Sequence, residues 1–111
     1  MRRNLVRYKA KPEQVQENER LIENVFQELH AKSPNGVRYL ALKLGDGTFV
    51  HFSMVEDSDA GSPIVALDAF HTFQSGIKER CIEAPQSSKS GLIRSLAPDP
   101  RPSTTRTQIY G

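Results

Sequence analysis

The chain has 111 residues, of which 37% are apolar, and it carries 15 Lys and Arg against 13 Asp and Glu. This length predicts one domain with a modest core, and the low apolar fraction favours completing that core by pairing with a second copy. Because basic and acidic residues are interleaved and the net charge is only +2, the sequence excludes nucleic-acid binding through a basic patch.

A strand and a long amphipathic helix are predicted first. Asn4 to Lys9 alternate loosely between polar and apolar residues, as a strand does. From Pro12 to about Lys32 the pattern is helical, because Pro12 suits a first turn and apolar residues recur at helical spacing. These apolar residues form one stripe: Val15, Ile22, Val25, Phe26 and Leu29. The segment from Ser33 to Gly36 ends the helix.

A β-hairpin follows. Val37 to Leu44 and Thr48 to Val55 have the composition of strands, and they are joined by the short glycine-rich loop Gly45 to Gly47. Such a loop is typical of hairpins. Pairing Leu44 with Thr48 then sets the register of the two strands.

A second helix and a last strand complete the predicted domain. The helix is expected from Ala66 to Ile82, and its inner residues are Ala69, Phe70, Phe73 and Ile77. The strand is expected within Gln86 to Leu96. Residues 1–96 therefore form one domain, and residues 97–111 form a proline-rich tail that is extended or exchanged with a partner chain. Thr105 to Tyr110 could add an edge strand.

The order of these elements is β-α-β-β-α-β. One hairpin and two helices on an antiparallel four-stranded sheet is the ferredoxin-like arrangement of the α+β class. In this arrangement the first strand lies next to the third. The helices cover only one face of the sheet, so the other face needs a second sheet to cover it.

The hairpin register sorts its residues onto two faces. Six even positions are apolar and are predicted to lie under the helices: Leu40, Leu42, Leu44, Val50, Phe52 and Met54. The odd positions are mixed and are predicted to face away: Val37, Tyr39, Ala41, Lys43, Phe49, His51 and Ser53. In the first strand Val6 and Tyr8 suit the helix side, which would leave Leu5, Arg7 and Lys9 on the face of His51.

The mixed face has two interpretations. A few polar groups among aromatic and aliphatic side chains are typical of a small-molecule pocket. In that case His51 is the candidate catalytic residue, and Arg7, Tyr39, Phe49 and Ser53 are candidate binding residues. Alternatively, the face is only a dimer interface, and His51 and Tyr39 are satisfied by hydrogen bonds. The sequence leaves both interpretations open.

Asn18 is a further candidate binding residue, because it falls inside the apolar stripe of the first helix. A buried amide needs hydrogen-bond partners. It can find them on a neighbouring strand or loop, or it can reach a cavity beyond the sheet edge.

Several classes of protein are excluded by what the sequence lacks. Its single cysteine, Cys81, allows no intrachain disulfide and indicates a reducing, cytoplasmic setting. No apolar run approaches the ~18 residues of a membrane span, and the basic N-terminus lacks the apolar segment of a secretory signal. The three histidines lie on separate elements without a second ligand at metal-motif spacing, so no metal site is predicted.

Three segments resemble the small dimeric α+β barrel proteins of the antibiotic biosynthesis monooxygenase-like superfamily. They are VRYKAKPEQVQENERLIENVFQEL, YLALKLGDGTFVHF and ALDAFHTFQSGIKERC. The resemblance extends from about Val6 to Leu96, and it rests on the order of elements and on the pattern Phe70-x-x-Phe73-x-x-Gly76-Ile77. It implies a homodimer in which two sheets face each other and form a barrel.

The resemblance also implies a choice of functions. Known activities in the superfamily are cofactor-free oxygenation of polycyclic aromatic substrates and haem degradation, and the members that degrade haem use an Asn, a Trp and a His. This chain has no tryptophan, Phe73 stands where those members carry the haem-ligating His, and His71 points elsewhere. The resemblance therefore favours a homodimer that binds a small aromatic molecule, and in its enzymatic form a cofactor-free monooxygenase.

In that enzyme His51 would be the base that deprotonates a phenol-like group, and Arg7 would stabilise the resulting charge. The alternative is a non-catalytic dimeric interaction protein whose barrel is filled by side chains. A cavity of roughly 300 Å³ or more, lined by some polar groups, would favour the first function.

Overall fold

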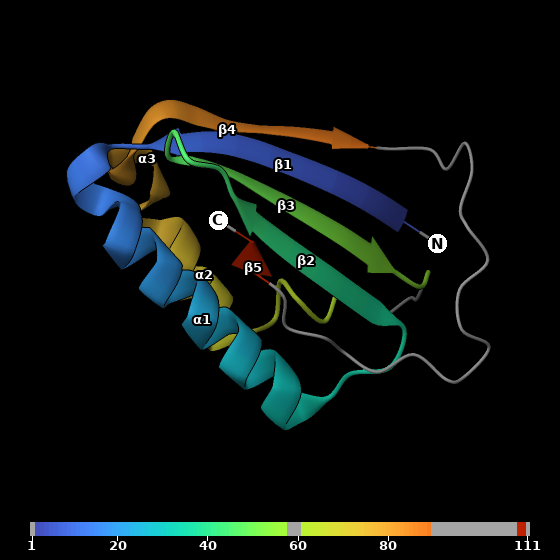
Figure 1. Ribbon diagram of the computed structural model, residues 1–111. Coiled ribbons are helices and arrows are strands. Elements are labelled where there is room, and N and C mark those ends of the chain that lie inside the picture. Colours follow the sequence, from blue (N-terminus) through green and yellow to red (C-terminus); the bar gives the residue numbers. More distant parts are fainter. Residues whose placement is uncertain (1, 58–60, 90–108, 111) are drawn as a thin grey trace.

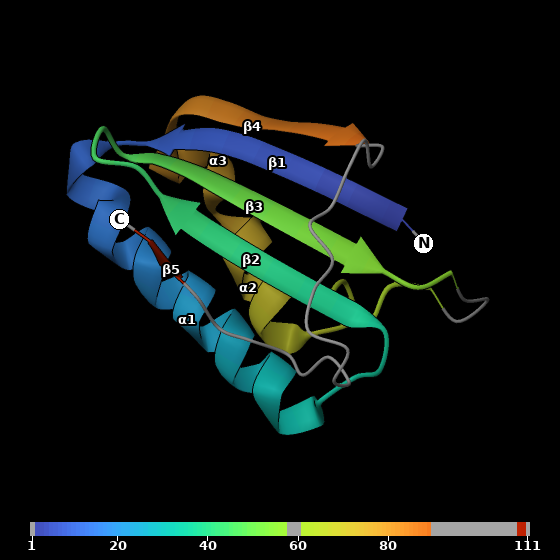
Figure 2. The same cartoon turned by 45° about the vertical axis from the view of Figure 1, so that its right-hand side comes forward.

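The chain folds into one β-sheet with its helices packed against one face (Figures 1 and 2). The computed structural model describes residues 2–57, 61–89 and 109–110. Its elements in chain order are β1 (Arg2–Ala10), the 3-10 helix η1 (Pro12–Gln14), α1 (Val15–Lys32), β2 (Val37–Lys43), β3 (Thr48–Val55), α2 (Asp68–Ser75), α3 (Ile77–Arg80), β4 (Cys81–Lys89) and β5 (Ile109–Tyr110).

The strand order confirms the predicted ferredoxin-like topology. The sheet runs β4-β1-β3-β2-β5, and its first four strands are antiparallel neighbours. The two-residue β5 pairs in parallel with β2, where Ala41 lies beside Ile109. Part of the predicted Thr105 to Tyr110 edge strand thus lies on the sheet of its own chain. The rest of the proline-rich tail and the predicted boundary at residue 96 lie outside the described residues.

The predicted hairpin register is also confirmed, since Val37 lies opposite Val55 and Ala41 opposite His51. The turn depends on Gly47, whose φ of +86° is a conformation that side chains rarely adopt. A Cβ atom there would lie 3.3 Å from the carbonyl oxygen of Ala10. The glycine therefore allows the turn to pack against the end of β1.

The second helix is shorter than predicted. It breaks at Gly76 into α2 and α3, and β4 already begins at Cys81. Glycine is a poor helix former, and the residues that follow gain a ladder with β1, where Cys81 pairs with Ala10. Pro85 is tolerated within β4 because this is an edge strand with an irregular register. The predicted last strand coincides with β4 only from Gln86 to Lys89.

The predicted assignment of the hairpin faces is wrong. The odd residues Val37, Ala41, Phe49 and His51 are buried under the helices. The even residues lie on the open face and are partly or fully exposed: Leu40, Leu42, Leu44, Val50, Phe52 and Met54.

The prediction for the first strand is correct only in part. Val6 and Tyr8 do face the helices, but Leu5, Arg7 and Lys9 do not share the face of His51. Val6 pairs with His51 and Tyr8 with Phe49, so these residues share the helix-covered face with the odd hairpin positions. A mixed face can be buried there because its polar groups bond to one another.

The helix-covered face holds the core. The apolar stripe of α1 is confirmed, since Ile22, Val25, Phe26 and Leu29 are all buried. From α2 the inner residue Phe73 is buried, and the other predicted inner residues pack against the core: Ala69, Phe70 and Ile77.

Glu28 of α1 anchors the start of α2. Its carboxylate accepts hydrogen bonds from the backbone N–H groups of Asp68, at 3.2 Å, and Ala69, at 2.8 Å, and it lies 2.8 Å from the ammonium of Lys32. Lys32 and these backbone donors hold the pKa of Glu28 below its usual range. A carboxylate at a helix N-terminus is favourable, so this contact helps to hold α2 at a set position over the sheet. Within the described residues, no helix combines the length and the apolar character that a membrane crossing requires.

Candidate functional site

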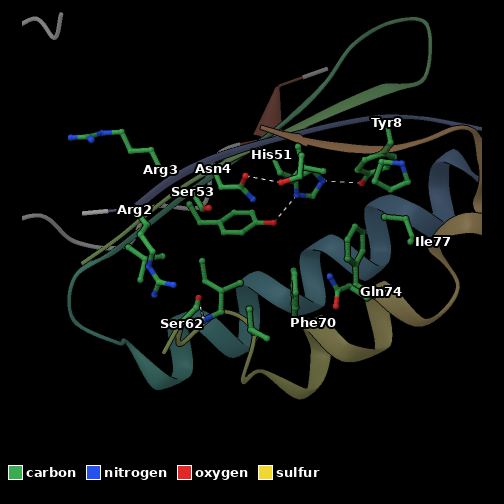
Figure 3. Close-up of a pocket in the computed structure, with 18 residues that line it drawn as sticks. Arg2, Arg3, Asn4, Tyr8, His51, Ser53, Ser62, Phe70, Gln74 and Ile77 are labelled. Carbon is green, nitrogen blue, oxygen red and sulfur yellow. Dashed lines mark hydrogen bonds between the residues drawn. The ribbon is translucent and has the colours of Figure 1, made fainter. Parts of the chain in front are cut away.

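A cavity of about 1020 Å³ lies between the helix-covered face of the sheet and α2 (Figure 3). It extends from Arg2 and Ser62 at one end to Tyr8 at the other, and Phe70 and Gln74 of α2 form the wall opposite the sheet. Its volume lies at the upper end of the range for sites that hold small molecules. It is larger than a second cavity of about 630 Å³, which is lined by residues of the Gly45–Gly47 turn and the start of α1.

His51 lies on the sheet side of this cavity, and a tyrosine hydroxyl contacts each of its ring nitrogens. Tyr39 Oη is 2.7 Å from Nδ1, and Tyr8 Oη is 2.8 Å from Nε2. Burial lowers the pKa of His51 to about 4 and raises the pKa of both tyrosines. All three groups are therefore neutral at pH 7, and they form a buried, uncharged polar cluster.

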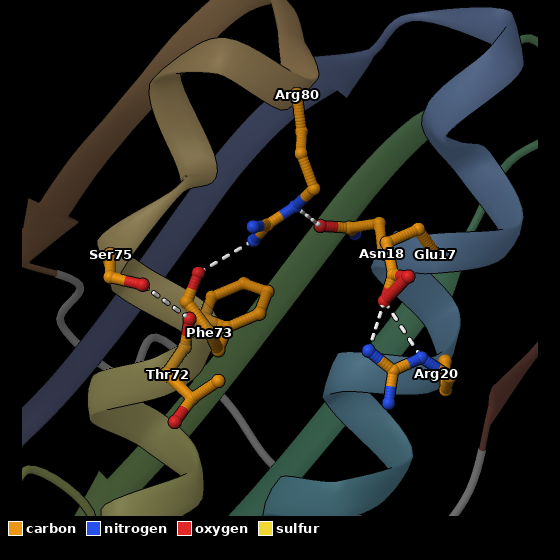
Figure 4. A network of polar contacts seen from close by, with 7 residues as sticks. All are labelled: Glu17, Asn18, Arg20, Thr72, Phe73, Ser75 and Arg80. Carbon is orange, nitrogen blue, oxygen red and sulfur yellow. Dashed lines mark hydrogen bonds and ion pairs between the residues drawn. The ribbon is translucent and has the colours of Figure 1, made fainter.

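A second set of contacts continues from Tyr8 through Asn18 to a buried arginine. Figure 4 shows this arginine, Arg80, with its partners Asn18 and Phe73. Asn18 donates from Nδ2 to Tyr8 Oη at 2.7 Å, and it accepts at Oδ1 from Nε of Arg80 at 3.1 Å. Arg80 also donates to the backbone carbonyl of Phe73 at 2.6 Å, and its guanidinium lies 5.2 Å from the centre of that ring. The side chain is only 7% exposed, so this positive charge is held mainly by neutral acceptors and an aromatic face.

Three of the six predicted site residues line the cavity: Tyr39, His51 and Ser53. They lie on the face that the helices cover, whereas the sequence placed them on the opposite face, towards a partner sheet. The three residues do line one cavity, but the element that closes this cavity is α2 of the same chain.

The other three predicted residues do not line it. Asn18 is fully buried and reaches the cavity residues only through Tyr8. Phe49 is buried beneath Tyr8, with the two rings stacked at 5.4 Å. Arg7 is exposed on the open face of the sheet, because its neighbours Val6 and Tyr8 point to the helices.

Sequence reasoning missed two residues of this region. Tyr8 was assigned to the helix side, but nothing in its local pattern showed that His51 would lie beside it. Arg80 stands in the last turn of α3, where a basic residue ordinarily interacts with the helix end and solvent. It turns inward here because its guanidinium reaches Asn18 of α1 and the backbone carbonyl of Phe73. Among the described residues, no group of three or more His, Cys, Asp or Glu side chains could hold a metal ion.

The fold resembles several solved structures. A candidate antibiotic biosynthesis monooxygenase of Bacteroides thetaiotaomicron is 15% identical with a TM-score of 0.72, over 88% of this chain and 95% of that chain. One from Caulobacter crescentus is 16% identical with a TM-score of 0.68, over 84% and 90%. A protein of unknown function from Nitrosomonas europaea is 20% identical with a TM-score of 0.67, over 88% and 94%.

At these identities the comparison shows a shared fold. It confirms the predicted ferredoxin-like α+β architecture and agrees with the family resemblance of the sequence. No protein-family model and no curated protein matches the chain.

Proposed function

We propose that this chain is a homodimeric protein that binds a small aromatic molecule in the cavity between the sheet and α2. In its enzymatic form it would be a cofactor-free monooxygenase. The observation that carries the proposal is the cavity itself, which is far larger than the roughly 300 Å³ that a small ligand needs. Its walls combine apolar and aromatic side chains, such as Phe70, Phe73 and Ile77, with the polar groups of Tyr39, His51 and Ser53.

The proposed reaction draws all of its electrons from the substrate. A bound phenol loses its proton and passes electrons to O₂. One oxygen atom becomes a new ring carbonyl, and the other leaves as water, so that phenol and O₂ give a quinone and H₂O. The protein would contribute by orienting the phenolate and shielding it from bulk water. The similarity to folds of candidate monooxygenases supports this reaction class.

One observation favours the non-catalytic alternative. Both ring nitrogens of His51 already contact tyrosine hydroxyls of the same chain. With its pKa near 4, the imidazole is also a weak base at neutral pH. His51 is thus better suited to hold and polarise Tyr39 than to take a proton directly from a substrate.

Binding can be tested by narrowing the cavity from α2. Gln74 lines the cavity, whereas His71 lies on the same helix, is exposed and does not line it. We expect Gln74→Trp to weaken the binding of 1-naphthol at least ~10-fold, because the indole occupies ligand space, and His71→Trp to leave it unchanged. Titration followed by isothermal calorimetry measures both affinities, and oxygen uptake by the same mixtures tests the reaction. Equal affinities for the two variants, or no binding by the parent protein, would contradict the proposal.

The open face of the sheet supports the homodimer. Along the two hairpin strands most of its exposed or partly exposed side chains are apolar and include Leu40, Val50, Phe52 and Met54, whereas Arg38 lies at one end, opposite Met54. Leu5 of β1 extends this face and is 36% exposed. No described helix covers it (Figure 2). A second copy presents the same apolar surface, so two sheets can bury each other.

We expect the parent protein to be a dimer at micromolar concentration and Phe52→Glu to be a monomer, because the new carboxylate would be buried without a partner. Val65→Glu is the matched control, since Val65 is an exposed apolar residue on the helix side. Light scattering coupled to size-exclusion chromatography gives the masses. A dimeric Phe52→Glu variant would rule out this face as the interface.

A further inference from the structure

Hydrogen bonds form one continuous chain from a buried cation to the cavity. Arg80 contacts Asn18 at 3.1 Å, and Asn18 contacts Tyr8 at 2.7 Å. Tyr8 contacts His51 at 2.8 Å, and His51 contacts Tyr39 at 2.7 Å. The five side chains come from α3, α1, β1, β3 and β2, so the chain crosses the whole core.

The first two bonds have only one possible direction. A guanidinium has no acceptor, so it donates to Asn18, and the amide must turn its oxygen towards Arg80. The amide nitrogen of Asn18 then faces Tyr8, and it also can only donate. The hydroxyl oxygen of Tyr8 is therefore an acceptor in this bond, and its own proton is left for one further bond.

The proton of Tyr8 decides which nitrogen of His51 carries hydrogen. Within the described residues, the remaining hydrogen-bond partner of Tyr8 is Nε2 of His51. If Nε2 were protonated, the hydroxyl proton of Tyr8 would be buried without an acceptor, which is costly. The neutral ring is satisfied when Nε2 accepts from Tyr8 and Nδ1–H donates to Tyr39.

The last group in the hydrogen-bond chain is then a donor that no other described residue uses. Tyr39 accepts from His51, and in the described part of the chain it has no other hydrogen-bond partner to receive its own proton. Tyr39 lines the cavity. In every bond of this chain, the donor is thus the residue farther from the cavity. Each hydrogen bond polarises its acceptor and so strengthens the next bond.

We propose that the Tyr39 hydroxyl donates a hydrogen bond to an acceptor oxygen of the bound molecule, and that Tyr8, Asn18 and Arg80 are positioning residues that hold His51 in its donor tautomer. This inference rests on the proposed function, because it takes the cavity as the binding site. It specifies the ligand class as an aromatic molecule that presents a phenolate, enolate or carbonyl oxygen to Tyr39. A donor chain that starts at a permanent cation favours negative charge on that oxygen.

The ligand class can be tested with 4-nitro-1-naphthol, whose phenolate and phenol forms differ in visible absorption. We expect the pKa of the bound probe to fall by about one unit or more, which corresponds to a tenfold preference for the anion. Tyr39→Phe should remove this shift and weaken binding of the anion roughly 10- to 100-fold. Thr72→Val is the matched control, because it removes an exposed hydroxyl of α2 that does not line the cavity and should leave the shift in place. An unchanged shift in Tyr39→Phe would overturn the proposal.

The direction of the chain can be tested without any ligand. Nitrogen-15 NMR of the His51 ring should show hydrogen on Nδ1 in the parent protein, and Tyr8→Phe should remove that preference because Nε2 loses its donor. If the probe binds but Nε2 carries the hydrogen, the proposal is overturned while the proposed binding function stands. If Nδ1 carries the hydrogen but no probe binds, the proposed function and the ligand class fail, while the direction of the chain stands.

Discussion

Acid should destabilise this protein through one buried side chain, and between pH 7 and pH 4 this effect should remove about 3 kcal/mol from the free energy of unfolding. His51 is 5% exposed, and burial lowers its pKa from 6.5 to about 4. Below pH 6.5 the unfolded chain therefore binds a proton that the folded chain does not. Stability is intact above pH 6.5, falls as the pH decreases towards 4, and this contribution then levels off.

The comparison with two variants isolates this effect. His51→Gln has no titrating group at this position but can still accept from Tyr8 and donate to Tyr39. His71→Gln removes an exposed histidine and should keep the full acid sensitivity. Both variants keep the carboxylates whose pKa is lowered in the fold, such as Glu28 and Asp46, so those contributions cancel.

Urea unfolding at pH 7, 6, 5 and 4 measures the free energies. We expect the curve of His51→Gln to be flatter than that of the parent protein by about 3 kcal/mol over this range. Parallel curves for the parent and His51→Gln would show that the histidine is accessible to solvent in the folded state. In that case Tyr8, His51 and Tyr39 would not form a polar cluster that is buried away from water.

Removing the buried guanidinium of Arg80 should also lower the free energy of unfolding substantially. Arg80→Met should lower the free energy of unfolding by roughly 2–4 kcal/mol, because the Asn18 side-chain oxygen and the Phe73 carbonyl both lose a charge-assisted hydrogen bond. The contact with the Phe73 ring is lost as well. Methionine keeps much of the buried apolar stem, so the loss reports mainly on the polar head.

Arg20→Met is the matched control for this change. Arg20 is exposed and pairs with Glu17 on the surface of α1 (Figure 4), so its removal should have little effect. Arg80→Lys should lie between the two, since an ammonium keeps the charge but cannot contact both acceptors with a planar fork. Urea unfolding at pH 7 gives the three values. If Arg80→Met and Arg20→Met lower the free energy of unfolding equally, Arg80 is solvated. The hydrogen bonds that lead to the cavity would then not begin at a buried charge.

Local patterns were sufficient for most of the fold. The stripe of α1 from Ile22 to Leu29 was predicted because a helix covered on one side repeats its apolar residues every three or four positions. The register of β2 and β3 was predicted because a short turn at Gly47 leaves little freedom in pairing. The second helix was predicted too long because its inner face ends at Ile77, whereas the residues after it continue a plausible helical pattern until sheet pairing takes over at Cys81.

Local patterns predicted only some of the residues of the candidate site. The grouping of Tyr39, His51 and Ser53 followed from strand alternation alone, and the structure places all three at the cavity. Tyr8 and Arg80 could not be added, because their contacts join residues 43 and 62 positions apart in the chain. No local pattern carries information about contacts at that separation.

The sequence by itself determined the elements, their order and the pairing within the hairpin, because turns, caps and periodicity act over a few residues. Only the tertiary structure decided which face of the sheet the helices cover. By composition, the apolar even positions of the hairpin are the better candidates to lie under the helices, yet the helices cover the odd positions. The reason is the register between β1 and β3, which are joined through the long helix α1 and not by a turn. That register sets Val6 beside His51 and Tyr8 beside Phe49, and the helices bring Asn18 and Arg80 to the polar atoms that would otherwise be costly to bury.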